Sequence, residues 1–236
     1  MGELMESGQG TALVRGPWGE TREVPEALEE LARQKTLAVY RANPWLERLT
    51  EAAGAIIRAD VTHTKRLKML RALADRINVA VSKQAACRRG CDACCKIQVE
   101  MTGWEAKIIG EEMGIKVKEP APAKAEDSKK RSMDLLGKPC GFLKAGECSI
   151  YASRPIACRV HHSLNMDAAM CQPEVNPAES MVPTLNMTML HLAYAACSGK
   201  TGAGDISEFF DEARRGPSVI ERCLDDGNGE GSGVGS

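Results

Sequence analysis

Four cysteines lie within a nine-residue stretch of this chain, CRRGCDACC. They are Cys87, Cys91, Cys94 and Cys95. The Cys-x2-Cys turn between Cys91 and Cys94 delivers two thiols from one local loop, which lowers the entropic cost of assembling a metal site. Adjacent side chains diverge, so Cys94 and Cys95 fit better if one serves a second ion, a cluster or an outer shell. Thiols this dense could form disulfides, act in catalysis or bind a metal.

A second group of cysteines follows downstream. Cys140 and Cys148 flank a predicted hairpin, turned by an Ala-Gly dipeptide, that would bring their thiols together. Cys158 lies shortly after Pro155, a residue suited to the first turn of a helix, so we expect the helix N-terminus to favour its thiolate. The predicted metal ligands are all eight clustered cysteines: Cys87, Cys91, Cys94, Cys95, Cys140, Cys148, Cys158 and Cys171.

Several thiolates would leave a metal site negatively charged, and basic side chains close in sequence could offset that charge. The candidates are Arg88, Arg89, Lys96, Lys138, Lys144, Arg154 and Arg159. A structural zinc site contributes about 10–16 kcal/mol of apparent binding energy, which is comparable to the stability of a whole domain. Such a site would explain how a stretch with few aromatic residues stays folded.

The cysteine pattern resembles the YkgJ-type cysteine-cluster family, which is also called the CxxCxxCC domain. The resemblance covers about residues 87–171 and is carried by CRRGCDACC, by TGWEA at residues 102–106, and by CSIYASRPIACR. The gap between Cys87 and Cys91 is one residue longer than in the name of the family. The resemblance implies that the cysteines chelate zinc or iron, with an iron–sulfur cluster included, and it implies no agreed reaction.

Three other uses of the thiols agree less well with the sequence. A disulfide framework is disfavoured by the length of the chain and by an N-terminus without a basic and then apolar secretion signal. The spacing of the first three cysteines is that of radical-SAM enzymes. However, Ala93 replaces the usual aromatic residue, and no repeated strand–helix units follow, as a barrel would require. No βαβ pattern surrounds the Cys-x2-Cys turn, as it does in thioredoxins.

Histidine, aromatic and isolated cysteine side chains are expected to have supporting roles. These residues are His63, His161, His162, His191, Phe142, Tyr151, Cys197 and Cys223. The pair His161-His162 is expected on the polar surface or just outside the ligands. Phe142 and Tyr151 are expected to pack around the site, and Cys197 and Cys223 to be free thiols. No Ser/His/Asp set, phosphate-binding glycine loop or paired acid motif occurs, so no catalytic residue is predicted.

Three amphipathic helices are predicted between residues 25 and 85, because apolar residues recur there with a period of 3.6. Asn43-Pro44 is typical of the N-cap and first turn of the second helix, and the third begins near Thr64. The side chains expected to face inward are Leu28, Leu31, Ala32, Ala38, Val39, Leu46, Leu49, Ala53, Ile56, Ile57, Leu67, Leu70, Ala74, Ile77 and Val81.

Shorter elements are predicted around the cysteines. Residues 97–101 alternate apolar and polar side chains, which indicates a strand. Thr102 and Glu105 then have the spacing of a capping box, and Gly114 would end the helix that they open. Residues 118–130 are rich in proline, alanine and charge, so we expect an exposed loop.

Two more helices are predicted toward the C-terminus. One follows Pro183, and a shorter one covers residues 205–215. The apolar face of the first contains Leu185, Met189, Leu192 and Ala196. The predicted segments are a flexible N-terminus, a helical region, the cysteine-cluster domain, C-terminal helices and a flexible tail, at residues 1–22, 23–86, 87–172, 173–222 and 223–236. The predicted fold is mainly α, with helical segments around a small irregular α/β cysteine-rich metal-binding centre.

The composition limits the partners of this protein. Its 31 basic and 32 acidic residues nearly balance and aromatic residues make up only 4%, which argues against nucleic acid. No apolar run approaches the roughly 20 residues that cross a bilayer, and we expect a cytoplasmic protein. We predict chelation of zinc or iron by the cysteines. The alternatives are an iron–sulfur redox enzyme or electron-transfer component, and a helical adaptor that docks a protein partner and is stabilised by structural zinc.

Overall fold

The structure, a computed structural model, describes residues 11–15, 21–120, 127–168, 171, 182–199 and 201–216. Its described part is mainly α-helical, as predicted, with strands that form short antiparallel pairs. The first pair joins β1 (Thr11–Arg15) to β2 (Thr21–Pro25). Cys223 and the predicted flexible tail lie outside the described residues. Among the helices that are described, none has both the length and the apolar character needed to cross a membrane.

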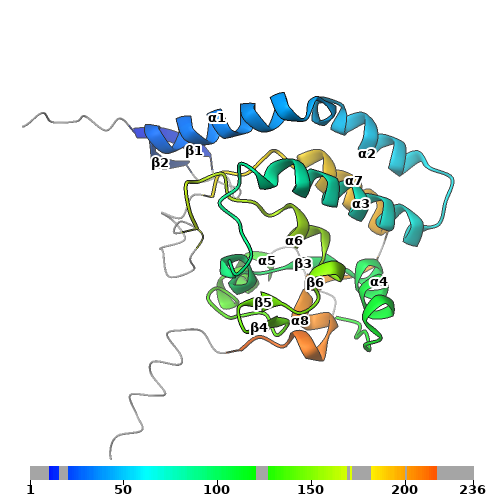
Figure 1. Ribbon diagram of the computed structural model, residues 1–236. Coiled ribbons are helices and arrows are strands. Elements are labelled where there is room, and N and C mark those ends of the chain that lie inside the picture. The colour runs from blue at the N-terminus through cyan, green and yellow to red at the C-terminus, as the bar shows by residue number, and fades with distance from the viewer. Residues whose placement is uncertain are drawn as a thin grey trace, which may run out of the picture.

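A helical layer forms one side of the molecule. It contains α1 (Glu26–Ala42), the 3-10 helix η1 (Pro44–Arg48), α2 (Leu49–Arg58), α3 (His63–Ser82) and α7 (Thr188–Ser198). Figure 1 shows α1 and α2 along the top, with α3 and α7 below them, and α7 packs against both α2 and α3. The three predicted helices are confirmed. Pro44 starts a 3-10 turn that Asn43 does not cap, because the Asn43 amide donates to the Val39 carbonyl oxygen at 3.0 Å.

Most of the side chains predicted to face inward are buried in this layer. They are Val39, Leu46, Leu49, Ala53, Ile56, Leu67, Leu70, Ala74, Ile77 and Val81. Ile57 is 37% exposed, so its predicted burial is wrong. Adjacent residues of a helix point about 100° apart, and here Ile56 alone of the two is buried. The four residues of α1 before Val39 that were predicted to face inward are only partly buried, since α1 lies at the outer edge of the layer (Figure 1): Leu28, Leu31, Ala32 and Ala38.

The predicted apolar face of α7 is also wrong. The helix begins at Thr188, so Leu185 precedes it, although Leu185 is buried as predicted. Leu192 is 57% exposed, and the buried face carries Leu190, Ala193 and Cys197. Because α7 is apolar around most of its circumference, its periodicity does not distinguish one face from another, and packing against α2 and α3 decides.

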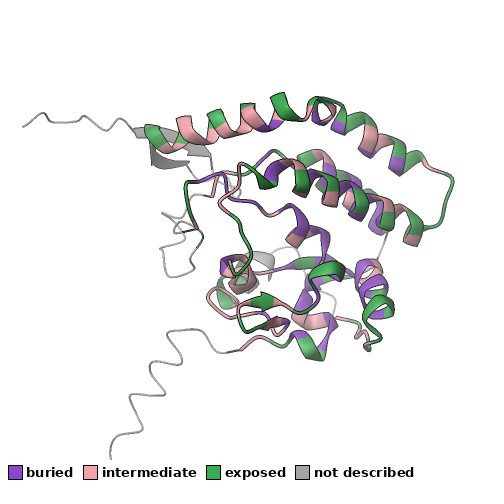
Figure 2. Ribbon diagram, in the orientation of Figure 1, coloured by how far each residue is buried: buried purple, intermediate pink, exposed green. Residues whose placement is uncertain are grey.

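The cysteine-rich half of the molecule lies below this layer and consists of short elements (Figure 1). They are η2 (Ala93–Lys96), β3 (Glu100–Thr102), α4 (Gly103–Met113), α5 (Asp127–Asp134), β4 (Leu143–Lys144), β5 (Glu147–Cys148), η3 (Tyr151–Ser153), α6 (Ile156–Val160), β6 (Ala203–Asp205), α8 (Ile206–Phe209) and η5 (Asp211–Ala213). Figure 2 shows buried residues along α6 and the segment after it, between the two halves. A second apolar core, built around Phe209 and Phe210, holds the cysteine-rich half together.

Local predictions in this half are partly confirmed. The hairpin of β4 and β5 turns at Ala145 and Gly146, whose φ angles of 49° and 79° are the positive values that a tight hairpin turn requires. The predicted strand is shorter than expected, because the Val99 N–H donates to the Asp205 side chain rather than to a strand partner. Residues 127–134 form α5, so the C-terminal end of the predicted loop is helical instead.

Gly141 marks a close approach of two backbone segments. It lies between Cys140 and Phe142, and a β-carbon at this position would lie 2.7 Å from the Arg214 carbonyl oxygen and closer still to that of Glu212. Backbone atoms cannot swing away as a side chain can. Gly141→Ala is therefore expected to lower the free energy of unfolding by about 1–3 kcal/mol, measured by urea denaturation.

Gly54→Ala is the matched control for this substitution. Gly54 lies inside α2, and the atoms nearest to an added β-carbon belong to the flexible Arg58 guanidinium, at 3.1 Å. Since alanine favours helix more than glycine does, this change is expected to stabilise the protein by about 0.5–1 kcal/mol. Similar unfolding midpoints for the two variants would contradict the close approach at Gly141.

Candidate metal centre

All eight cysteines predicted as metal ligands lie in the described part of the chain, and every described cysteine is a free thiol. Cys87 and Cys91 lie in the loop after α3, Cys94 and Cys95 in η2, and Cys140 before β4. The remaining three occupy β5, α6 and an isolated described position: Cys148, Cys158 and Cys171. No disulfide joins the described residues, so the disulfide alternative finds no support there.

Four of these thiols line one small cavity of about 30 Å³. The lining residues are Cys95, Cys140, Cys148, Cys158, Arg154, Pro155 and the apolar Val99, Phe142, Leu143, Ile150 and Ile206. The Cys140 N–H donates to the Cys95 carbonyl oxygen at 2.8 Å, which fixes two of the cysteine backbones side by side. The β4–β5 hairpin adds Cys148, which pairs with Leu143. Segments far apart in the sequence therefore deliver thiols to one place.

The other four cysteines are not part of the cavity lining, and Ser163 connects two of them. The Ser163 N–H donates to Cys87 Sγ at 3.4 Å, and the Ser163 side chain is hydrogen-bonded to Cys171. The Cys91 N–H donates to the Arg88 carbonyl oxygen at 3.0 Å and so closes the turn that leads into η2. Cys171 thus lies at the same place as the start of the first cysteine motif.

Desolvation favours the neutral form of three thiols that line the cavity. Burial raises the pKa of Cys140, Cys148 and Cys158 above the usual thiol value, and thiolate charge on nearby cysteines raises that of Cys158 further. At the start of α6, desolvation of Cys158 therefore opposes the thiolate form that the helix N-terminus was expected to favour. A cation placed among these sulfur atoms would reverse the preference, since it stabilises the thiolate form.

Arg154 is the basic residue that lines the thiol cavity. Its guanidinium lies 3.9 Å from the ring centroid of Tyr151, which is 60% exposed and supports Arg154 rather than enclosing the site as expected. Burial raises the pKa of Cys148 and Cys158, and the charge of Arg154 partly counters that effect. Arg154 Nε is buried and has no hydrogen-bond partner among the described residues, so it is available to a sulfur atom or a ligand.

Two other predicted basic residues have partners outside the cavity. Arg89 forms an exposed ion pair with Glu147 at 2.7 Å. Arg159 is buried and binds the Asp75 carboxylate and the Arg154 carbonyl oxygen, so it anchors α6 to α3. Their charges therefore serve surface and structural contacts.

His162 is buried, which excludes one of its two predicted places, the polar surface. Its Nε2 lies 2.9 Å from Asn78 Oδ1 of α3, and it is 3% exposed. Burial lowers the pKa of His162 to about 4, which leaves the ring neutral at pH 7. The contact joins the segment after α6 to the helical layer.

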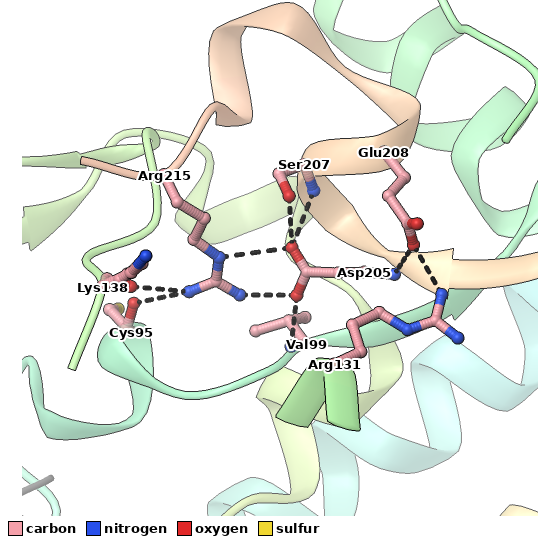
Figure 3. A network of polar contacts seen from close by, with 8 residues as sticks. All are labelled: Cys95, Val99, Arg131, Lys138, Asp205, Ser207, Glu208 and Arg215. Carbon is pink, nitrogen blue, oxygen red and sulfur yellow. Dashed lines mark hydrogen bonds and ion pairs between the residues drawn. The ribbon is translucent and has the colours of Figure 1, made fainter. Parts of the chain in front are cut away.

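Sequence reasoning missed a buried ion pair between Arg215 and Asp205. Arg215 Nη2 lies 2.6 Å from Asp205 Oδ2, and the two side chains are 5% and 0% exposed. Figure 3 shows the same guanidinium donating to the carbonyl oxygens of Cys95 and Lys138, both at 3.1 Å. Asp205 also accepts the Val99 N–H at 2.8 Å. The pair therefore holds the backbone of Cys95 and Val99, two residues that line the thiol cavity.

The Asp205 carboxylate stays ionised despite its burial. Burial alone would raise the pKa of Asp205, but hydrogen bonds and charge from Arg215, with hydrogen bonds from Ser207, hold it below the usual value. On the other side of this network, Glu208 accepts from the Asp205 N–H at 2.6 Å and from Arg131 of α5 at 2.9 Å (Figure 3). This segment was predicted as a short helix, and its charges gave no sign of burial.

Glu105 also has a role that differs from its predicted one. It makes no capping box with Thr102, whose side chain does not cap α4. The fully buried Glu105 carboxylate accepts the Ile156 N–H at 2.7 Å and the Tyr194 hydroxyl at 2.7 Å. Burial raises the pKa of Glu105, while these two donors favour the ionised form. Glu105 thus fixes the start of α6, the helix that carries Cys158.

Glu105→Ala is expected to lower the free energy of unfolding by about 1–3 kcal/mol, because it leaves the buried Ile156 N–H without its acceptor and leaves the Tyr194 hydroxyl only Thr102 Oγ1. Urea denaturation measures the loss. Glu111→Ala, at an exposed position of the same helix, is the control and is expected to change the midpoint little. Equal losses in the two variants would show that the Glu105 contacts contribute nothing specific.

The thiols do not converge on one point in this structure. In the part of the chain that is described, no group of three or more cysteine, histidine, aspartate or glutamate side chains is already arranged to hold a metal ion. A cysteine thiol moves by rotation about a single side-chain torsion between staggered positions. Such rotations are the motion by which thiols around a common cavity would reach one ion.

Comparison with known proteins identifies the region that contains these cysteines. The model of the CxxCxxCC family, described as "Putative zinc- or iron-chelating domain", matches residues 86–177. Searches of the curated proteins and of the solved structures found no match. The matched region covers all eight clustered cysteines together with Glu105 and Arg154, whereas Asp205 and Arg215 lie beyond it. Residues 86–177 of this chain are therefore similar to the CxxCxxCC family.

Proposed function

We propose that this protein binds zinc through its clustered cysteines, and that the bound metal stabilises the cysteine-rich half of the molecule. One observation carries the proposal. Four thiols from η2, the loop before β4, β5 and α6 line a single cavity. Apolar side chains make up most of its other walls. A free thiol among apolar side chains does not need other thiols beside it, so the grouping of four requires another explanation. Four around one cavity are what a closed tetrahedral zinc site uses.

The donor chemistry agrees with a divalent cation. Thiolate sulfur is a preferred ligand of both zinc and iron. Burial raises the pKa of Cys140, Cys148 and Cys158, so each would bind the metal with release of a proton. The charge of Arg154 would offset part of the negative charge that remains, since four thiolates exceed the charge of one divalent ion.

The size of the cavity favours zinc over an iron–sulfur cluster. A volume of about 30 Å³ has room for an ion or one or two water-sized occupants. An iron–sulfur cluster adds several iron and sulfide atoms between the cysteine ligands and would require the walls to move apart. Zinc would serve here as a structural ion, because four protein ligands leave no open position for a substrate.

The experiment is metal analysis of the full chain, purified without added metal under anaerobic conditions and combined with a visible spectrum. A colourless protein with stoichiometric zinc is expected. A brown protein with stoichiometric iron and sulfide would replace zinc by a cluster, and a protein free of both metals would overturn the proposal. Cys197→Ala is the control, because Cys197 is a buried thiol in the core of the helical layer and should not affect the metal content.

A further inference from the structure

We infer that Arg154 is a positioning residue of the metal site, and that its Nε–H donates a hydrogen bond to a metal-bound thiolate of the thiol cavity. Two observations carry this inference: Arg154 lines the same cavity as four thiols, and its Nε is a buried donor without a partner among the described residues. The inference rests on the proposed metal binding and deepens it, because it names the group that orients a ligand sulfur atom.

The guanidinium of Arg154 lacks the partner that a buried arginine normally has. The residue is partly buried, yet it forms no ion pair with any carboxylate in the part of the chain that the structure describes. By contrast, Arg159 is paired with Asp75, and Arg215 is paired with Asp205. A buried donor without an acceptor is costly, and so is a shielded charge without a counter-charge. A bound anionic sulfur atom would relieve both costs.

Contacts within the protein hold Arg154 in place. Arg159 Nε donates to the Arg154 carbonyl oxygen at 2.8 Å, and the link from Arg159 to Asp75 anchors this backbone to α3. The Arg154 guanidinium carbon lies 3.9 Å from the centroid of the Tyr151 ring. A cation–π contact uses the charge of the guanidinium and leaves its N–H groups for other acceptors. Because the donor is already positioned, it loses little conformational entropy when it binds a sulfur atom.

A thiolate is the acceptor that the cavity offers to this donor. Apart from Arg154 and the four cysteines, the described residues that line the cavity are apolar. A neutral thiol accepts hydrogen bonds only weakly, whereas a hydrogen bond between two ionised groups is strong. Metal binding converts thiols to thiolates, so the bond from Arg154 would form together with the metal site. Arg154 would then favour the loaded state over the empty one.

The first test is the zinc affinity of the full chain, measured by competition with a chromogenic chelator. Arg154→Ala is expected to weaken zinc binding about 10–100-fold, the usual effect of losing a group that orients a metal ligand. Arg154→Lys keeps the positive charge but lacks both the Nε–H and the planar guanidinium, so it should recover little of the loss. Full recovery by lysine would reduce the role of Arg154 to its charge and would overturn the proposed hydrogen bond.

Arg89→Ala is the matched control, because Arg89 is also close in sequence to the cysteines. Its side chain is 88% exposed and lies 2.7 Å from Glu147. Such a surface pair contributes little, so the zinc affinity of this variant should stay close to that of the wild type. Equal losses in the Arg89 and Arg154 variants would contradict a specific role for Arg154.

Tyr151→Ala tests the same donor without changing Arg154. Tyr151 is 60% exposed, so this variant should fold like the wild type. Without the ring, the guanidinium is held less firmly, and a smaller loss of zinc affinity is expected than in Arg154→Ala. An affinity equal to that of the wild type would contradict the positioning of Arg154 by the ring.

A spectrum of the cobalt-loaded protein separates a hydrogen bond to sulfur from a general loss of stability. The bands that transfer charge from thiolate sulfur to Co²⁺ depend on the electron density of the sulfur atom, which a hydrogen bond lowers. In Arg154→Ala saturated with Co²⁺, these bands are therefore expected at longer wavelength than in the wild type. Bands at the same wavelength would overturn the inference and leave the proposed metal binding intact. A wild type that binds neither Zn²⁺ nor Co²⁺ would overturn the proposed function itself.

Discussion

Removal of the bound metal is expected to unfold the cysteine-rich half of the molecule while α2 and α3 stay far better protected. The elements around the thiols are short: β4 and β5 have two residues each, and α6 has five. Elements of this length are not stable by themselves. A structural zinc contributes about 10–16 kcal/mol of apparent binding energy, which exceeds what such elements gain from their own contacts. The measurement is hydrogen exchange by mass spectrometry, before and after chelation.

The comparison is internal to the chain. Peptides from residues 140–160 should lose most of their protection on chelation, and peptides from α3 should lose much less. α3 has 20 residues and packs against α7 in a core without clustered cysteines. Equal loss of protection in both regions would mean that the metal stabilises the molecule as a whole. Unchanged exchange near the cysteines would mean that it has no structural role.

Arg215→Ala is expected to lower the free energy of unfolding by about 3–5 kcal/mol, because it leaves the Asp205 carboxylate buried without its counter-charge. The same change removes the donor to the carbonyl oxygens of Cys95 and Lys138, which lie beside the thiol cavity. Urea denaturation of the zinc-loaded protein measures the loss. The thiol cavity should also release zinc faster, since the backbone of Cys95, one of its proposed ligands, is no longer held.

Arg33→Ala is the matched control, because it removes an arginine from an exposed ion pair. Arg33 of α1 lies 2.7 Å from Glu30, with side chains that are 64% and 45% exposed. Solvent screens such a pair, so its loss should leave the unfolding midpoint close to that of the wild type. If the two arginine variants unfold at the same urea concentration, the buried pair does not have the role assigned to it.

The sequence by itself determined the features that depend on near neighbours in the chain. Helical periodicity located the three N-terminal helices, although Ile57 proved to be exposed. The Ala145-Gly146 turn predicted the β4–β5 hairpin, because few residues adopt two successive positive φ angles. The density and spacing of the cysteines indicated the CxxCxxCC family, whose model matches residues 86–177. In each case the signal lies within a short stretch.

Only the tertiary structure decided how distant residues meet. Glu105 has the spacing of a capping residue, yet it accepts hydrogen bonds from Ile156 and Tyr194, which lie far along the chain. Arg215 was predicted only as the last residue of a short helix, and its burial depends on the partner Asp205 and on two carbonyl oxygens of the cysteine-rich half. Spacing between near neighbours contains no information on such contacts, because they form only when the second core assembles.

The thiols illustrate the same division. Their types and spacing identified eight candidate ligands, and that assignment remains a prediction. Their grouping around a cavity and around Ser163 was not predictable, because Cys140, Cys158 and Cys171 come from separate segments that packing brings to the first motif. Burial, which raises the pKa of the Cys158 thiol, likewise appears only in the folded chain. The types and spacing of residues along the chain determine which ligands are available. Desolvation and long-range contacts determine where in the fold these ligands meet.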